Sequence, residues 1–219
     1  LPEAQLNDRI SVYGPMDRLR GGQVDDAAVF ALRQCALEMM HSWRQSPVRG
    51  FVGGRIDLIP HQLYIAQEVC NRMAPRVLLS DEVGLGKTIE AGLILHRQLV
   101  TGRASRVLIL VPESLVHQWF VEMMRKFNVW VNIFDEERCA SIEKGHPAAN
   151  PFLDDQVILC SIDYLTANPE RAEQAKEAGW DLLVVDEAHH LEWSENWSSE
   201  EYQLVELLSN EAEGLLLLT

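Results

Sequence analysis

Residues 80–90, SDEVGLGKTIE, combine glycines, a lysine and a threonine at a spacing that suits phosphate binding. A β-rich run, residues 76–79, precedes this segment, and a helical pattern follows it. The N–H groups at a helix start supply positive potential to an anion. Gly84 and Gly86 would let successive N–H groups face inward, which a Cβ would obstruct. Strand, glycine-containing turn and helix together predict a phosphate-binding loop.

The side chains at the end of this segment are those that a nucleoside triphosphate requires. Lys87 could reach the β- and γ-phosphates, and the Thr88 hydroxyl could bind Mg²⁺. The general pattern G-x-x-x-x-G-K-[ST] is matched incompletely, because Asp81 stands where its first glycine belongs. On this segment alone, an ordinary loop and helix cap remains the alternative. The residues predicted to bind the nucleotide are Asp81, Glu82, Val83, Gly84, Leu85, Gly86, Lys87 and Thr88.

An acidic pair follows a second apolar run, residues 182–185. Open α/β sheets bind ligands at the carboxyl ends of their parallel strands, where Asp186 and Glu187 would lie. Asp186 could hold the Mg²⁺ that bridges two phosphates, and Glu187 could orient and deprotonate the attacking water. Capping of a following helix is the alternative interpretation. Two half-sites, each after a strand and in this order, favour one site for ATP and Mg²⁺.

Alternating strands and helices must position these residues. The pattern predicts an α/β fold with a mostly parallel sheet and helices on both faces. Predicted strands cover residues 77–80, 107–111, 129–134, 157–161, 182–186 and 215–218. Predicted helices cover residues 61–73, 88–99, 113–127, 169–178 and 198–208.

The N-terminal quarter differs from this pattern. Residues 1–24 are polar and broken by prolines and glycines, which predicts a linker. Asp25 and Asp26 are candidate N-caps for a helix that runs to about Trp43 with its apolar residues on one face. Packing on its own domain is favoured over docking to another domain. The predicted organisation is a linker (1–24), a helical extension (25–55) and a nucleotide-binding lobe (56–219).

Composition narrows the class of protein. The chain has 219 residues, of which 47% are hydrophobic, enough for a sizeable core. No apolar run reaches transmembrane length, so no membrane partner is expected. The four cysteines are widely spaced, which favours buried free thiols in a reducing cytoplasm over a disulfide or metal framework. The absence of an initiator methionine suggests a piece of a longer chain.

The negative charge is concentrated at one end. Residues 151–219 hold sixteen acidic and two basic residues, which accounts for the whole net charge of −14. An acidic surface repels phosphate backbones, so this piece alone should bind nucleic acid poorly. Trp193, Trp197 and Tyr202 lie in this stretch, and local packing or a protein contact is favoured for them over base stacking.

The two motifs together resemble those of superfamily-two helicase-like ATPases. The sequence of residues 81–88, Asp-Glu-Val-Gly-Leu-Gly-Lys-Thr, is similar to the phosphate-loop motif of the SWI/SNF-type DNA translocases. An aspartate at the place of Asp81 is normal in that branch. Residues 186–189 form a DEAH box. The resemblance covers residues 56–219 and implies the first RecA-like lobe of such an ATPase. It also implies that Gln62 reads adenine, which suits an amide that both donates and accepts.

The resemblance implies further roles and partners. Residues 111–119 and 160–165 are similar to segments that contact the DNA backbone, and His189 would couple the nucleotide to a motif that opens at Thr219. The expected partners are double-stranded DNA and a second RecA-like lobe that supplies arginine fingers. Several segments are most similar to a bacterial, RNA polymerase-associated branch, which implies binding to core RNA polymerase, its recycling, and a place in the cytoplasm with the nucleoid.

Three alternatives remain open at this stage. A helicase-like ATPase of a bacterial defence or repair system shares the first motif. A DEAH-type RNA helicase differs in substrate rather than in chemistry. A nucleotide-binding docking domain without turnover is the non-enzymatic alternative, although the presence of Lys87, Asp186 and Glu187 weighs against it. Without a second lobe, the isolated chain is expected to hydrolyse ATP very slowly.

Overall fold

The chain divides into two compact units, residues 1–47 and 48–219. The computed structural model describes residues 14–23, 26–46, 48–51, 53–57, 59–80, 86–146 and 149–219. The boundary falls before residue 48, not at residue 56 where the sequence pattern placed it. Residues 48–55 belong to the second unit because Phe51 is buried, the Gly50 carbonyl lies 2.6 Å from His96 Nδ1, and Arg55 N–H donates to the Lys126 carbonyl.

The first unit contains two helices. Helix α2 (Pro15–Arg20) lies within the predicted linker, and Pro15 at its first position explains why a helix begins there. Helix α3 (Ala27–Gln45) is the predicted helix, capped by Asp26, whose Oδ1 accepts from Ala28 N–H at 2.7 Å. No residue of either helix is buried. Cys35 of α3 is exposed, unlike the buried thiols of Cys70, Cys139 and Cys160, so the expectation of four buried cysteines was wrong for this one.

The second unit is built on a parallel sheet of six strands in the order β1-β8-β5-β2-β4-β3. The strands are β1 (Arg76–Leu79), β2 (Val107–Val111), β3 (Asn132–Phe134), β4 (Val157–Ser161), β5 (Leu182–Val185) and β8 (Gly214–Leu218). The central strand β2 pairs with β5 on one side and with β4 on the other, so that Val107 is opposite both Leu182 and Val157. This arrangement confirms the predicted parallel α/β fold.

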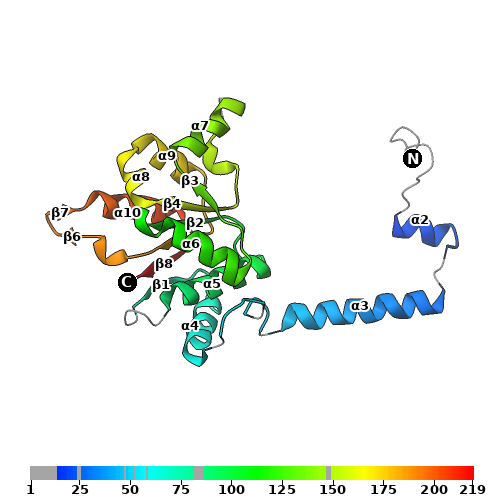
Figure 1. Ribbon diagram of the computed structural model, residues 1–219. Coiled ribbons are helices and arrows are strands. Elements are labelled where there is room, and N and C mark those ends of the chain that lie inside the picture. The colour runs from blue at the N-terminus through cyan, green and yellow to red at the C-terminus, as the bar shows by residue number, and fades with distance from the viewer. Residues whose placement is uncertain are drawn as a thin grey trace. The chain divides into compact units, whose positions relative to one another are not determined.

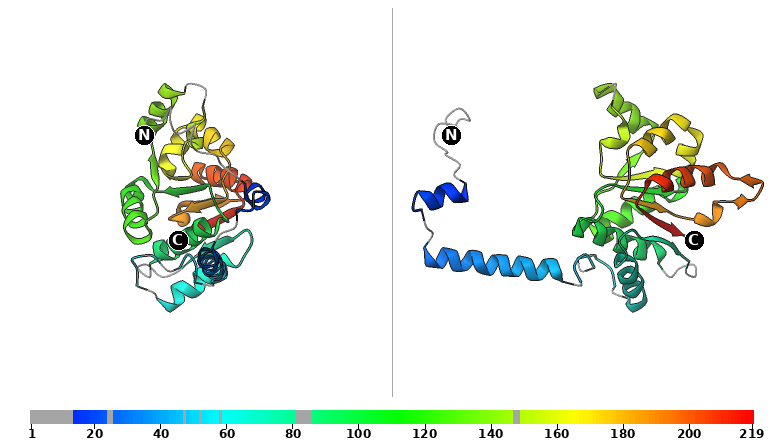
Figure 2. Two further views of the ribbon diagram at one scale, coloured as in Figure 1. Left: turned by 90° about the vertical axis from the view of Figure 1, so that its right-hand side faces the viewer. Right: turned by 180° about the vertical axis from the view of Figure 1, so that it is seen from behind.

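Helices cover both faces of the sheet (Figures 1 and 2). One face is covered by α4 (Pro60–Cys70), α5 (Lys87–Thr101), η1 (Glu113–Leu115), α6 (Val116–Glu122) and the π-helical turn η2 (Met123–Phe127). The other is covered by α8 (Ile162–Ala167), α9 (Pro169–Glu177) and α10 (Glu200–Glu211). The remaining elements are α7 (Glu136–Gly145), η3 (Pro151–Leu153), η4 (Ala188–His190), β6 (Trp193–Ser194) and β7 (Trp197–Ser198).

Strand β2 shows why the central strands are continuously apolar. Its side chains alternate between the two layers, so that Ile109 packs in the core under α4, α5 and α6, and Leu108 and Leu110 pack in the core under α8, α9 and α10. All five residues of β2 are fully buried. A strand covered on both faces has no position that tolerates a polar side chain. Among the described residues, no helix has the length and apolar character needed to span a bilayer.

Several described elements besides α2 were not predicted from the sequence, among them α7, α8 and the strands β6 and β7. Helix α7 has few apolar residues and is fixed through Arg171 of α9, which pairs with Glu136 (2.7 Å) and with Glu143. Helix α8 is only one and a half turns long, which is too short for a periodic pattern. Strands β6 and β7 form an antiparallel hairpin that presents Trp193 and Trp197, 62% and 58% exposed. Of the two interpretations favoured from the sequence, local packing was wrong for these two tryptophans, and a protein contact stays a prediction.

A buried glycine gives the first testable prediction. A Cβ on Gly92 of α5 would overlap the ring of Phe127, whereas a Cβ on Gly145, at the end of α7, would meet nothing within 4 Å. We expect Gly92→Ala to destabilise the chain by about 1–3 kcal/mol through overpacking. Gly145→Ala is the control, because alanine favours a helix and no clash opposes it. Urea unfolding measures both changes, and equal midpoints for the two variants would contradict the packing of α5 on η2.

Candidate nucleotide-binding site

Three adjacent strands end at one edge of the sheet and bring the two motifs together. Strand β8 lies between β1, which leads to the phosphate loop (residues 81–88), and β5, which leads to Asp186. Neighbouring strands are about 4.8 Å apart, so β1 and β5 end roughly 10 Å from one another. The Thr219 N–H donates to the Leu79 carbonyl at 3.1 Å, and the Asp186 N–H donates to the Leu110 carbonyl at 2.9 Å. These bonds continue the sheet to the residues that begin the site.

The described part of the phosphate loop is its C-terminal end. Gly86 is the N-cap of α5 with φ +86° and ψ 42°, a left-handed conformation that glycine adopts without strain. Lys87 and Thr88 are the first two residues of α5 and are half-buried. Asp81, Glu82, Val83, Gly84 and Leu85 lie outside the described residues, so their contacts with phosphate remain predictions.

Asp186 lies where burial and charge act on it in opposite directions. Burial raises the pKa of the Asp186 carboxyl, while a hydrogen bond from Trp119 and the positive charge of Lys87 lower it. Because β8 pairs with both β1 and β5, the strands that lead to Lys87 and to Asp186 end at the same edge of the sheet, although the two residues are 99 positions apart in the sequence.

Glu187 is held in an uncommon backbone conformation. Its φ is +51°, and left-handed backbone costs a residue with a Cβ about 1 kcal/mol. Two hydrogen bonds hold the turn: the Glu187 N–H donates to Asp186 Oδ1 at 2.9 Å, and the Glu187 carbonyl accepts from His190 N–H at 3.0 Å. Strain of this kind persists where the surroundings over-determine the conformation, often at functional sites.

Gln62 lies beside the phosphate loop. It is a buried residue of α4, 3% exposed. Its Nε2 lies 2.7 Å from the place that a Cβ on Gly86 would occupy. The structure thus brings the glutamine predicted to read adenine to the end of the loop predicted to bind phosphate. Glycine suits position 86 for two reasons. It adopts the positive φ without strain, and it leaves room for the Gln62 amide.

Trp119 and Asp163 join the site to segments that were expected to contact DNA, and sequence reasoning assigned neither a role at the site. The Trp119 indole Nε1 donates to Asp186 Oδ2 at 2.7 Å. Asp163 Oδ2 accepts from the Glu113 N–H at 3.1 Å, which connects the start of η1 to α8. A tryptophan on the inner side of a helix carries no sequence signal that identifies the strand end it reaches, so only the fold could reveal this contact.

His189 and Thr219 are the two residues predicted to couple the nucleotide to motion, and the structure shows what each of them contacts. His189 Nδ1 lies 3.1 Å from Glu187 Oε2, and its ring stacks on that of His190 at 4.1 Å between centroids. Thr219 bonds to β1 through its backbone. Both residues lie at the same sheet edge as the DEAH box, and their coupling role remains a prediction.

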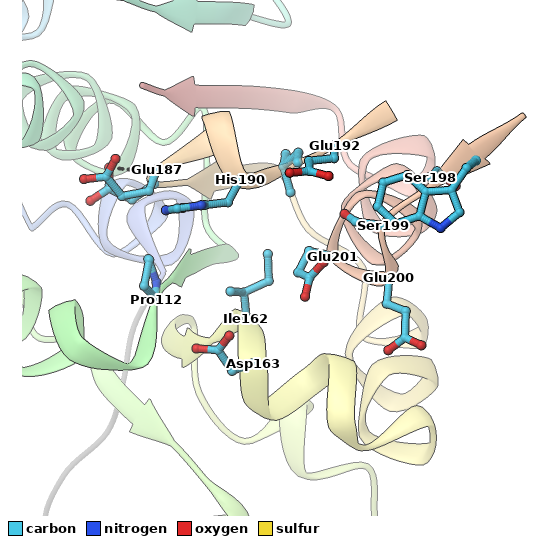
Figure 3. Close-up of a pocket in the computed structure, with 13 residues that line it drawn as sticks. Pro112, Ile162, Asp163, Glu187, His190, Glu192, Ser198, Ser199, Glu200 and Glu201 are labelled. Carbon is cyan, nitrogen blue, oxygen red and sulfur yellow. Dashed lines mark hydrogen bonds between the residues drawn. The ribbon is translucent and has the colours of Figure 1, made fainter. Parts of the chain in front are cut away.

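A cavity of about 660 Å³ opens beside the DEAH box (Figure 3). It is bordered by Pro112 after β2, by Ile162 and Asp163 after β4, and by the start of α10. Six carboxylates line it and none of its lining residues is a lysine or arginine. The carboxylates are Asp163, Asp186, Glu187, Glu192, Glu200 and Glu201. The segments expected to contact DNA therefore border an acidic surface in this chain.

The donor set fits Mg²⁺ that arrives with a nucleotide. Carboxylate and hydroxyl oxygens are ligands that Mg²⁺ prefers, and Asp186 and Thr88 supply one of each. Within the part of the chain that the structure describes, no cluster of three His, Cys, Asp or Glu side chains could hold a metal by itself. Phosphate and water oxygens would have to complete the shell, as is usual for Mg²⁺ at triphosphate sites.

The strand order and the likeness to a solved structure described below define the fold as that of a RecA-like lobe. The SNF2-related domain matches residues 36–215, so the chain belongs to the SNF2-related family. This confirms the resemblance to SWI/SNF-type ATPases that the phosphate loop and the DEAH box indicated.

Relatives and a solved structure agree with this assignment. Over its whole length, the chain is 55% identical to the RNA polymerase-associated protein RapA of Actinobacillus pleuropneumoniae and 57% identical to RapA of Vibrio cholerae. It spans 23% and 22% of these two proteins, less than a quarter of their length. The SWI2/SNF2 ATPase core of Sulfolobus solfataricus, solved in complex with dsDNA, has a TM-score of 0.63 at 20% identity, over 76% of this chain and 32% of that one. That likeness shows the shared fold.

The contact between Gly86 and Gln62 can be tested by comparing Gly86, the N-cap of α5, with Gly102, its C-cap. Both have positive φ, +86° for Gly86 and +72° for Gly102, so alanine should cost about 1–2 kcal/mol of stability at each. Only at position 86 would the Cβ displace Gln62, because nothing lies within 4 Å at position 102. We expect Gly86→Ala to weaken binding of a fluorescent ATP analogue at least tenfold and Gly102→Ala to leave it unchanged. Equal affinities of the two variants for the analogue would show that Gln62 and Gly86 do not belong to the nucleotide site.

Proposed function

We propose that this chain is the first ATPase lobe of a protein that uses ATP hydrolysis to move on double-stranded DNA and to recycle RNA polymerase during transcription. The observation that carries the proposal is the pairing of β8 with both β1 and β5, which ends the strands that lead to Lys87 and to the Asp186–Glu187 pair at one edge of the sheet. Membership of the SNF2-related family supports ATP-dependent remodelling. The role at the polymerase is supported by the relatives, which are named as RNA polymerase-associated proteins.

Each residue of the site has one task in this mechanism. Lys87 and the N-terminal N–H groups of α5 bind the phosphates of ATP, and Gln62 binds adenine. Thr88 and Asp186 would hold Mg²⁺, which neutralises charge on the β- and γ-phosphate oxygens. Glu187 orients the attacking water and accepts its proton. Its neighbour His189, 3.1 Å away, can hold that carboxylate in place.

The lobe is incomplete as a catalyst. Phosphoryl transfer also needs cations that stabilise charge on the γ-phosphate in the transition state, and arginine fingers contribute about 10³–10⁵ in rate. In SWI/SNF-type ATPases these residues come from the second RecA-like lobe. We therefore assign turnover to the complete protein, which carries both lobes, and expect this chain alone to bind nucleotide weakly and hydrolyse it very slowly.

The acidic cavity limits how this lobe meets DNA. Carboxylates beside the segments after β2 and β4 repel phosphates, so the lobe should contribute few contacts of its own to nucleic acid. Binding to double-stranded DNA would depend on the rest of the complete protein. We place that protein in the bacterial cytoplasm with the nucleoid, because that is where DNA and core RNA polymerase are found.

Two substitutions in the complete protein separate binding from hydrolysis. Lys87→Ala should abolish nucleotide binding and turnover, because it removes the cation that contacts the phosphates. Glu187→Gln should keep nucleotide binding and lower turnover by about 10²–10⁴, because an amide cannot accept the proton. Glu195→Gln, in the β6–β7 hairpin, is the matched control and should change neither. ATP binding and phosphate release are the measurements, and wild-type turnover in Glu187→Gln would refute the assigned mechanism.

Substrate and partner are tested on the complete protein as well. Double-stranded DNA should raise the ATPase rate more than RNA of equal length, and immobilised core RNA polymerase should retain the protein. A rate raised by RNA alone would point instead to a DEAH-type RNA helicase. Failure to bind polymerase together with stimulation by DNA would favour a DNA-directed ATPase of a defence or repair system.

A further inference from the structure

We propose that Trp119 is a positioning residue that fixes the Asp186 carboxylate for magnesium, an inference that rests on the proposed ATPase function. Trp119 belongs to α6, and its indole Nε1 donates to Asp186 Oδ2 at 2.7 Å. The tryptophan is 1% exposed and lies in the core cluster beneath α4, α5 and α6. A buried ring of this size has one position available, so its N–H is a fixed donor.

Two fixed donors hold the two oxygens of the carboxylate. Oδ2 accepts from Trp119, and Oδ1 accepts from the Glu187 backbone N–H at 2.9 Å. A carboxylate has about four lone-pair sites, so each oxygen keeps one for a metal or its bound water. Because one donor is a helix side chain and the other is the backbone of the turn that follows β5, the carboxylate cannot rotate without breaking a hydrogen bond. The lone pairs that remain are therefore held in fixed directions before magnesium arrives.

The hydrogen bond from Trp119 to Asp186 does more than provide an acceptor for a buried indole N–H. Trp180 shows what that alone requires: it is 3% exposed, and its Nε1 donates to the Ala175 backbone carbonyl at 2.7 Å, within its own layer. Trp119 instead reaches from the helix after β2 to the end of the neighbouring strand β5 and bonds to a carboxylate. Hydrogen bonds to a charged group are roughly twice as strong as those between neutral groups. Removing this one should therefore affect the geometry of Asp186 as well as the core.

The expected effect is on metal affinity rather than on nucleotide affinity. Loss of a residue that orients a metal ligand typically weakens metal binding by about 10–100-fold. In the complete protein, we expect Trp119→Phe to weaken Mn²⁺ binding in the presence of ADP by about that factor, measured by electron paramagnetic resonance. Binding of ADP in EDTA should change by less than about twofold, because Lys87 and the α5 amides are untouched.

Trp180→Phe is the matched control. It removes an indole hydrogen bond of the same length from a tryptophan of similar burial and leaves Asp186 alone. We expect it to lose stability, measured by urea unfolding, and to keep wild-type Mn²⁺ affinity. Should Trp119→Phe fail to fold, β-(3-benzothienyl)alanine at position 119 keeps the ring volume and lacks the N–H. That variant should fold and still show weakened Mn²⁺ binding.

Asp186→Asn separates this inference from the proposed function. If Asp186→Asn weakens Mn²⁺ binding while both Trp119 variants bind Mn²⁺ as the wild type does, the magnesium site stands and the positioning role of Trp119 is overturned. If Asp186→Asn itself binds Mn²⁺ with wild-type affinity, Asp186 is not a metal ligand and the proposed site fails first. Equal losses in Trp119→Phe and Trp180→Phe would show a general effect of core damage and also overturn the inference.

Discussion

Parallel pairing of β8 between β1 and β5 is the constraint on which the site depends. It aligns the carboxyl ends of three strands at one edge, so that the phosphate loop, Thr219 and the acidic pair leave the sheet within about 10 Å of one another. Strand β8 consists of one glycine and four leucines, so the strand between the two motifs carries no charged side chain. A shift of one residue in this register would move each motif by more than 3 Å.

Two features of the site cost free energy, and contacts with the surrounding elements stabilise both of them. Asp186 is a carboxylate in a place where burial favours its neutral form, and Glu187 adopts a backbone conformation that a Cβ disfavours. Each cost is opposed by a specific contact: Lys87 and Trp119 favour the charge on Asp186, and two hydrogen bonds hold the turn at Glu187. Mg²⁺ would bring opposite charge to the same carboxylate and would further favour its ionised form. On the proposed function, the arrangement would bind Mg²⁺ through groups that are already ordered.

Much of this architecture follows from the sequence, and the exceptions have physical causes. Strands such as residues 107–111 were predictable because burial on both faces demands an unbroken apolar run. The two motifs were predictable because phosphate and magnesium restrict residue type and spacing. Helix α7 and the hairpin were not, because α7 is held by the distant Arg171 and the hairpin pairs only two residues a side. The contact of Trp119 with Asp186 depends on strand order, which local patterns do not encode.

The negative charge of this lobe bears on how it would interact with DNA and with a second lobe. Catalysis requires carboxylates at the edge of the sheet, and here further acids after β5 and at the start of α10 extend that negative surface into a cavity. A surface of this kind repels DNA and attracts cations, whether Mg²⁺ or the arginines of a second lobe. On the proposed function, the same charges that prepare the lobe for nucleotide and for a partner lobe would keep it from binding nucleic acid alone. Productive contact with DNA would then require the complete protein and would tie ATP hydrolysis to assembly of both lobes on their substrate.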